Sequence, residues 1–221
     1  MNTGKILEFL QELQQNNTRE WFGQNKSRFD QLRSDFESFL NELIPEVHKV
    51  DPGIGLVAAK DCMFRIYRDV RFSKDKAPYK TNFGAFIAEN GRKSLKAGYY
   101  FHLSPEESFL GGGIYMPSPE ILKAIRQEVY FNSEELKQIM SEPDFRRIYG
   151  GVHDMEDKLK KPPKDYPADF KDMDLLRHKS YTVWHTLTEE ELSSQALLGA
   201  IVQKFKAMVP FNAFLNRIFL G

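Results

Sequence analysis

Arginine, lysine and tyrosine side chains are concentrated in one short stretch of the sequence, residues 65–80. Guanidinium groups bind phosphate and carboxylate oxygens in pairs, lysine adds a compact positive charge, and tyrosine offers a hydroxyl donor or a ring for stacking. The stretch therefore predicts a site for a ligand that carries phosphate or carboxylate. The ligand-binding residues that we predict are Arg65, Tyr67, Arg68, Asp69, Arg71, Lys74, Lys76, Tyr79 and His102.

These side chains have different predicted roles. In a predicted strand, Arg68 lies on the same face as the apolar residues and therefore points inward. It needs an acidic partner there, because a buried guanidinium without one is costly. The nearest acidic candidates are Asp61, Asp69 and Asp75. We expect Arg68 and Asp69 to form a supporting pair. The direct contacts to the anion are assigned to Arg65, Arg71, Lys74 and Lys76.

The remaining polar groups, on Tyr67, Tyr79 and His102, would supplement the basic cluster. Tyr100 and His102 are two residues apart, so in a strand they share a face and could line the same concavity. If the site carries out a reaction, His102 or Asp75 is the candidate general acid or base. No nucleophile stands out, so no catalytic residue is assigned.

Two other interpretations of the basic stretch stay open. In the first, the arginines form an internal lattice of ion pairs with acidic helices, such as those bearing Asp30, Asp35 and Glu37, and no ligand binds. In the second, the protein is not an enzyme and docks an acidic partner on its basic surface. Replacing Arg71 and Lys74 by glutamine would lower the stability of the protein markedly only if these residues anchor a lattice.

Other patterns carry less information about chemistry. Gly111-Gly112-Gly113 precedes a predicted helix and could cradle phosphate, although glycines in a strand more often permit close packing. Pro143-Asp144 followed by Glu156-Asp157-Lys158 fits the spacing of a Mg²⁺-dependent nuclease loosely, but not its expected place on adjacent strands. The histidines and the single cysteine lack zinc-site spacing, so we predict neither a metal nor a cofactor.

Charge is balanced overall and polarised along the chain. The sequence has 31 basic and 31 acidic residues, so bulk attraction to nucleic acid or to anionic lipid is not expected. Between Lys60 and Lys96, however, ten basic residues stand against four acidic ones, a local excess of six positive charges. This polarity favours an anionic small molecule or a nucleic-acid fragment as the partner.

The sequence also indicates a cellular compartment. Cys62 is the only cysteine and cannot form an internal disulfide, and residues 1–20 lack the continuous apolar run of a signal peptide. No stretch is apolar for long enough to span a bilayer. We therefore expect a cytoplasmic protein that contacts no membrane, with the oligomeric state left open.

Helices are predicted towards both ends of the chain. Apolar residues at helical spacing predict a first helix over residues 5–13. A second begins at Asn17, with Glu20 completing a capping box, and Pro45 should kink or end it. These two helices form a long N-terminal helical hairpin. Further helices, the first capped by Ser118, are predicted over 119–130, 133–140, 169–178, 189–208 and 210–219.

Between the helical regions the apolar period changes to two, which is typical of strands. The predicted strands cover 62–67, 82–89, 97–103, 108–115 and 181–187. Short turns join the middle ones, which favours an antiparallel meander. We therefore predict an α+β fold in which an antiparallel sheet of about five strands has helices packed largely on one face. No linker or repeat divides the chain, so residues 1–221 are predicted to form a single domain.

The basic stretch is also part of a wider motif pattern. Residues 65–80 read RIYRDVRFSKDKAPYK, and the stretches that accompany it are 16–22, 99–103, 111–117 and 175–180. Together they resemble a mainly bacterial family called domain of unknown function 2461, over nearly the whole chain. The resemblance implies a shared fold and marks the basic stretch as the place to look for a site. It implies no activity, because the function of that family is not established.

Overall fold

The fold is α+β, and a computed structural model describes residues 1–152 and 158–220. The strands are β1 (Phe83–Ile87), β2 (Gly98–Leu103), β3 (Phe109–Ile114) and β4 (Tyr181–Thr186). The N-terminal helices are α1 (Thr3–Gln15), α2 (Arg19–Gln24), α3 (Lys26–Val50) and α4 (Ala59–Cys62). The later helices are α5 (Pro119–Phe131), α6 (Ser133–Ser141), α7 (Pro143–Tyr149), α8 (Met173–Leu176), α9 (Glu189–Ser193) and α10 (Leu197–Asn216).

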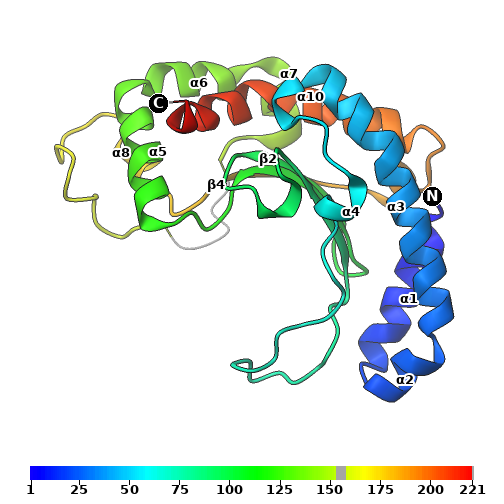
Figure 1. Cartoon of the computed structure of the whole chain (residues 1–221). Coiled ribbons are helices and arrows are strands. Elements are labelled where there is room, and N and C mark those ends of the chain that lie inside the picture. Colours follow the sequence, from blue (N-terminus) through cyan, green and yellow to red (C-terminus); the bar gives the residue numbers. More distant parts are fainter. Residues whose placement is uncertain (153–157, 221) are drawn as a thin grey trace.

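The strands form one antiparallel sheet in the order β1-β2-β3-β4. These are four of the predicted strands, but the predicted strand over residues 62–67 is wrong. Cys62 ends a helix, and the following chain makes only isolated bridges, from Met63 to Ala85 and from Tyr67 to Tyr79. A strand needs a continuous partner, and here the chain turns away after a single bridge to the sheet. Residues 65–80, which we call the basic loop, project from the sheet (Figure 1).

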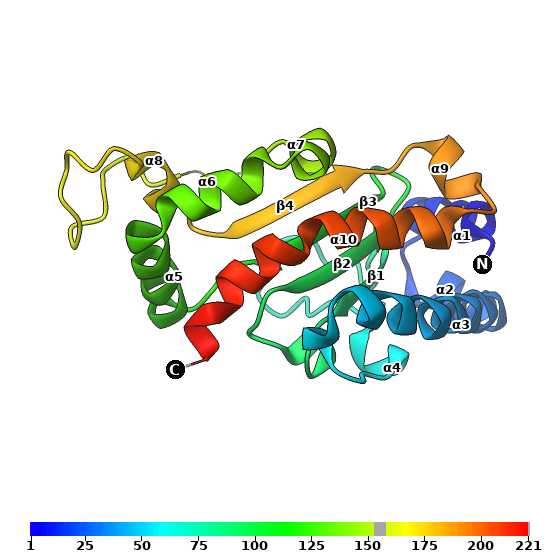
Figure 2. The ribbon, with the colours of Figure 1, turned by 90° about the horizontal axis from the view of Figure 1, so that it is seen from above.

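One face of the sheet is buried under helices. Figures 1 and 2 show α10 crossing this face and α3 running beside it. Phe101 of β2 packs against Phe36 of α3, with ring centroids 5.8 Å apart, and Tyr99 packs against Phe205 of α10 at 4.9 Å. Because side chains alternate along a strand, the neighbours of these residues lie on the opposite face.

The long N-terminal helices α1 and α3 pack against each other through Phe9 and Phe29, whose centroids are 6.0 Å apart. The helix that follows α1 is capped by Thr18, whose hydroxyl accepts a hydrogen bond from the Trp21 N–H at 3.2 Å. The predicted cap, Asn17, instead binds the backbone of Tyr79 with both its amide nitrogen and its oxygen. A bond to a distant segment therefore replaces the local one.

Prolines do not end helices where the sequence predicted it. Pro45 lies inside α3 and Pro210 inside α10, so α3 continues to Val50 and the predicted break between 208 and 210 is wrong. A proline costs a helix one hydrogen bond. The burial of Phe205 and Phe211 on either side of Pro210 offsets this cost.

The described chain between β3 and β4 contains α5, α6, α7 and α8, in a region where helices were predicted. Ser118 caps α5 by accepting a hydrogen bond from the Ile121 N–H, and Pro119 occupies the first turn, which confirms the predicted start. The helix predicted over residues 169–178 is reduced to the single turn of α8, whereas α7 was not predicted.

A substitution at Gly112 tests the packing between the sheet and α10. A Cβ at this position would overlap the Met208 sulfur and the Gly98 carbonyl oxygen. We expect Gly112→Ala to lower the free energy of unfolding by about 1–3 kcal/mol, because the backbone oxygen cannot move aside. Urea denaturation measures the change. The control is Gly199→Ala, which has no atom within 4 Å of the new Cβ and should be neutral or stabilising by up to about 1 kcal/mol.

Candidate functional site

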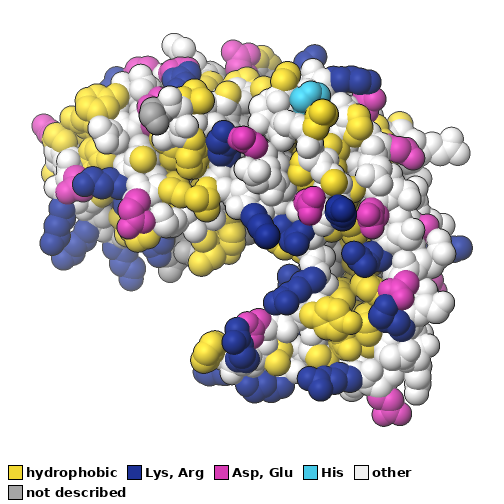
Figure 3. Space-filling model, viewed as in Figure 1, with side chains coloured by type: hydrophobic (Ala, Val, Ile, Leu, Met, Phe, Trp, Pro, Cys, Tyr) yellow, Lys and Arg dark blue, Asp and Glu magenta, His cyan; other side chains and the backbone are white. Residues whose placement is uncertain are grey.

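A hollow of about 580 Å³ lies on the sheet face that α10 leaves open. Figure 3 shows the molecule hollowed on the side of the projecting basic loop. Aromatic side chains line the hollow together with glycines, aliphatic side chains and a few polar groups. The lining includes Phe64, Lys80, Asn82, Phe86, Tyr100, His102, Phe109 and Trp184.

The hollow forms because side chains alternate along the strands and because glycines occupy positions on this face. Tyr100 pairs with Phe86 on one side and with Gly111 on the other, and Gly111 pairs in turn with Trp184. Gly111 has no side chain, so the floor between the rings is backbone. Gly84 has a similar role, since a Cβ there would lie 2.7 Å from the Tyr100 hydroxyl oxygen. The aromatic side chains can therefore lie against the sheet without filling the space above it.

His102 is the central polar side chain of this face. Its Nδ1 lies 2.9 Å from the Tyr100 hydroxyl, and its ring stacks on Phe109 with centroids 4.7 Å apart. The Asn82 amide nitrogen lies 3.5 Å from the same Nδ1. Burial lowers the pKa of His102 to about 4 and raises that of Tyr100 to about 12. At neutral pH the imidazole is uncharged and the phenol keeps its proton, so His102 can accept a proton or a hydrogen bond but is not a source of positive charge.

Lys80 brings a positive charge to the hollow. Its ammonium group lies 5.4 Å from the centroid of the Phe64 ring, and no described acidic side chain forms an ion pair with it. Burial and then the positive charge of Arg65 lower its pKa. Lys80 and Arg65 thus place two positive charges near each other, and Arg65 also forms no ion pair with a described residue.

The other two cations at the hollow are already engaged. Lys96 forms an ion pair with Glu89, and the Arg92 guanidinium donates to the backbone oxygens of Lys60 and Asp61 at 3.0 and 2.9 Å. Lys80 is therefore the lining cation that is best placed to meet a ligand.

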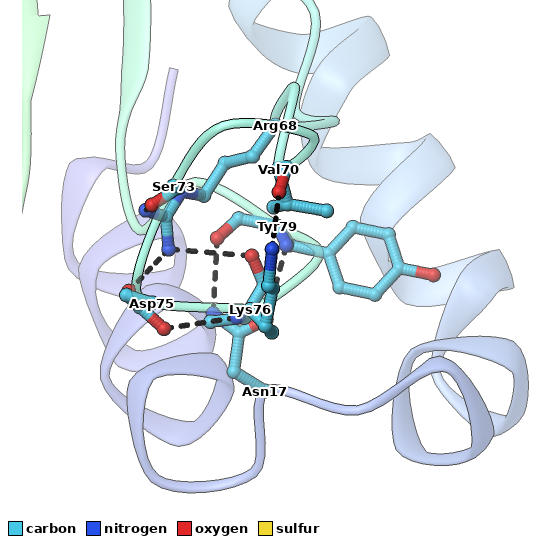
Figure 4. Close-up of polar contacts among 8 residues, drawn as sticks. Asn17, Arg68, Val70, Ser73, Asp75, Lys76 and Tyr79 are labelled. Carbon is cyan, nitrogen blue, oxygen red and sulfur yellow. Dashed lines mark hydrogen bonds and ion pairs between the residues drawn. The ribbon is translucent and has the colours of Figure 1, made fainter.

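Within the basic loop, Arg68 is a structural residue. Figure 4 shows it pointing towards Asp75, with which it forms an ion pair, and it also donates to the Ala77 carbonyl at 3.2 Å. Asp75 was one of the three predicted partners, but the predicted pair of Arg68 with Asp69 is wrong. The peptide N–H of Ala77 and the Arg68 guanidinium hold the pKa of Asp75 below its usual value. This carboxylate closes the loop and lies outside the residues that line the hollow.

Asp69 is instead the partner of Arg71. Its carboxylate accepts hydrogen bonds from Arg71 Nε at 2.9 Å and from Nη2 at 2.7 Å. The Lys76 ammonium donates to the Val70 carbonyl, and Lys74 is exposed without an ion pair to any described residue. The loop therefore balances two of its arginines internally and keeps the positive charge of its lysines.

The predicted lattice with acidic helices does not form at the positions named for it. Asp30 pairs with Lys26, and Asp35 accepts a hydrogen bond from Gln31, both within α3. The ion pairs of the basic loop are made between its own residues. Among the described residues, Arg68 and Arg71 pair with acids of the loop and form no ion pair with α3.

The two predicted tyrosines lie against α2. Tyr79 is buried and stacks on Phe22, with centroids 4.0 Å apart and planes at 17°, and Tyr67 packs on the same ring while remaining half exposed. Tyr79 is therefore part of the core. Tyr67 keeps part of its surface available to a ligand.

Of the predicted ligand-binding residues, His102 lines the hollow, and the others belong to the basic loop or to the core beneath it. Lys80, Asn82 and Trp184 also line the hollow and were not among the predicted ligand-binding residues. Lys80 stood at the end of the basic signature, and the alternation of β4 places Trp184 on the face of Tyr100 and His102. These signals were present in the sequence, but the pairing of β3 with β4 was needed to connect them.

The other patterns receive no support as ligand sites. Gly111, Gly112 and Gly113 lie inside β3 between two partner strands, so the ladder uses their backbone groups and no phosphate cradle forms. Asp144 pairs with Arg147, and Lys158 pairs with Asp174. Glu156 and Asp157 of the nuclease pattern lie outside the described residues.

Within residues 1–152 and 158–220, no three His, Cys, Asp or Glu side chains gather closely enough to hold a metal ion. None of the helices described here has the length and apolarity needed to cross a membrane.

Comparison with known proteins identifies a family. A family model described as conserved hypothetical protein (DUF2461) matches residues 5–214. The chain belongs to this family. No curated protein and no solved structure matches it. The description of DUF2461 names no activity.

The uncharged state of His102 predicts a pH-dependent stability. The unfolded chain binds a proton on this residue below about pH 6.5, whereas the folded protein does so only near pH 4. Stability is therefore lost as the pH falls from about 6.5 to about 4, by roughly 2 kcal/mol at pH 4.5. Urea unfolding at pH 7 and pH 4.5 should show a smaller difference for His102→Gln than for the wild type. An NMR titration that placed this imidazole near pH 6.5 would contradict the burial argument.

The different roles of Arg68 and Arg71 predict different effects of substitution. Arg68→Gln should destabilise the protein by about 1–2 kcal/mol, because Asp75 and the Ala77 carbonyl lose their donor. Arg71→Gln should leave stability unchanged, because the Arg71 side chain is 76% exposed. Thermal unfolding and limited proteolysis of the basic loop measure both effects. Equal destabilisation by the two variants would restore the lattice interpretation.

Proposed function

We propose that this protein binds an anionic ligand with a flat, apolar part in the hollow on the open face of the sheet. The observation that carries the proposal is the positive charge of Lys80, beside Arg65, at a hollow with aromatic walls. A partly buried ammonium group without a counter-ion is unfavourable, and its pKa falls accordingly. A phosphate or carboxylate group on a ligand would supply the missing negative charge.

The aromatic walls favour a ligand with a ring. Phe86, Tyr100, Phe109 and Trp184 present ring faces or edges to the hollow. Aromatic pairs stabilise each other by about 0.5–1.5 kcal/mol beyond the area that they bury. The volume of about 580 Å³ also falls within the range of roughly 300–1,000 Å³ that is usual for small-molecule sites.

The polar groups of the hollow would orient such a ligand. Uncharged His102, the Tyr100 hydroxyl and the Asn82 amide stand close together on one side of the floor. They can exchange hydrogen bonds with the edge of a heterocycle or with a sugar hydroxyl. If the bound ligand reacts, His102 is the candidate base, because a neutral imidazole can accept a proton.

Ligand binding can be tested by a thermal-shift screen with nucleoside monophosphates, aromatic carboxylates and inorganic phosphate. A ligand present at a hundred times its Kd should stabilise the fold by about 2.7 kcal/mol, and we expect this from anions that carry a ring. Lys80→Gln should weaken their binding about tenfold or more, since a hydrogen bond to a charged group contributes roughly 1.5–3 kcal/mol. Lys206→Gln, on exposed α10 surface, is the matched control and should bind as the wild type does.

Trp184 provides a second readout that is specific to the hollow. Its ring lines the site, so a bound ligand should change its fluorescence, and Trp184→Phe should remove most of the change while Trp21 remains. The proposal fails if no ring-bearing anion shifts the unfolding temperature. It also fails if Lys80→Gln binds every anion as tightly as the wild type.

A further inference from the structure

We infer that the ligand is single-stranded nucleic acid, with bases stacked in the hollow and a backbone that continues along the basic loop. The inference rests on the proposed function of the hollow and names its ligand class. It is carried by aromatic rings and unbalanced positive charges that continue from the sheet onto the loop.

The basic loop is unusual in the side chains that it exposes. Phe72 is 95% exposed and Tyr67 is 49% exposed, although both are large aromatic residues. The Arg71 guanidinium lies over the Phe72 ring, 5.9 Å from its centroid. Single-stranded nucleic acid uses such features, because every unpaired base can stack on an aromatic ring or on a guanidinium plane.

The loop also carries positive charge that its own acids do not balance. It contains six basic and two acidic side chains, and both acids are engaged, Asp69 with Arg71 and Asp75 with Arg68. The remaining cations are Arg65, Lys74, Lys76 and Lys80. Figure 3 shows the dark-blue basic side chains along the projecting part of the molecule. A phosphodiester backbone carries regularly spaced negative charges, which a short carboxylate or phosphate ligand does not.

The hollow and the loop form one surface. Phe64 immediately precedes the basic loop and Lys80 is its last residue, and both line the hollow. The Phe64 ring packs edge-on against Tyr100, with centroids 6.0 Å apart and planes at 80°. A ligand that occupies the hollow therefore reaches the loop without crossing an acidic surface.

Unpaired bases fit this surface better than the competing polyanions do. In a duplex the bases stack on each other and cannot lie against rings in a hollow. An acidic protein could neutralise the lysines, but it would not need aromatic rings at the glycine-lined floor. An anionic membrane could accept Phe72 and the lysines of the loop, but it would leave the hollow empty.

The length of the ligand is the first test. We would measure fluorescence anisotropy with a labelled oligothymidylate of about ten nucleotides, which lies within the usual site size for single strands. It should bind at least tenfold more tightly than thymidine monophosphate, and more tightly than a duplex of the same length. The affinity should also fall with salt, with a slope of about −0.7 for each phosphate contact.

Substitutions in the loop test its part in binding. Phe72→Ala should weaken oligonucleotide binding about fivefold or more, and Phe72→Leu should weaken it similarly, because leucine is apolar but cannot stack. The double variant Lys74→Gln, Lys76→Gln should reduce the magnitude of the salt slope by about 1.4, since two phosphate contacts are lost. Lys206→Gln should bind as the wild type does. None of these variants should change the binding of thymidine monophosphate.

The outcomes separate this inference from the proposed function. Binding of the monophosphate without a gain from length, equal binding of the duplex, or an unchanged affinity of Phe72→Ala overturns the single-strand inference and leaves the hollow as an anion site. Wild-type affinity of Phe72→Leu, or tighter binding to anionic vesicles than to the oligonucleotide, overturns it as well, since apolar contact would then replace stacking. Failure of every nucleotide and every other ring-bearing anion to bind overturns the proposed function itself.

Discussion

Strand alternation is the constraint on which the rest of this structure depends. Tyr99 and Phe101 of β2 must face the helices to complete the core, so Tyr100 and His102 must face away from them. The same rule in β3 turns Gly111 to the open face and leaves the space that the flanking rings surround. The burial that stabilises the sheet and the hollow on its other side are thus produced by the same sequence pattern.

Much of the fold could be predicted because local patterns specify it. The alternation of β1 to β4 and the cap of α5 involve residues close together in the sequence, and these predictions are confirmed. The errors arise where distant contacts override local preference. Asn17 was a reasonable helix cap, but it binds Tyr79, and Pro210 stays within α10 because aromatic residues around it are buried.

The candidate site was harder to predict for a related reason. Residue types placed the positive charge correctly in residues 65–80, but they could not show which charges were already balanced. The sequence separated Arg68, as a residue that needs an acidic partner, from Arg71, but only the path of the loop shows that Asp75 is that partner and that Asp69 pairs with Arg71. Lys80 gained its importance from aromatic neighbours on the sheet, which no spacing within the basic stretch could reveal.

The contact between Asn17 and Tyr79 links two parts of the chain that are 62 positions apart. Asn17 lies at the junction of α1 and α2, and its side-chain amide holds the end of the basic loop in place (Figure 4). Together with the stacking of Tyr79 on Phe22, these hydrogen bonds attach the end of the basic loop to α2. The position of the loop beside the hollow therefore depends on a segment that contributes no side chain to the hollow.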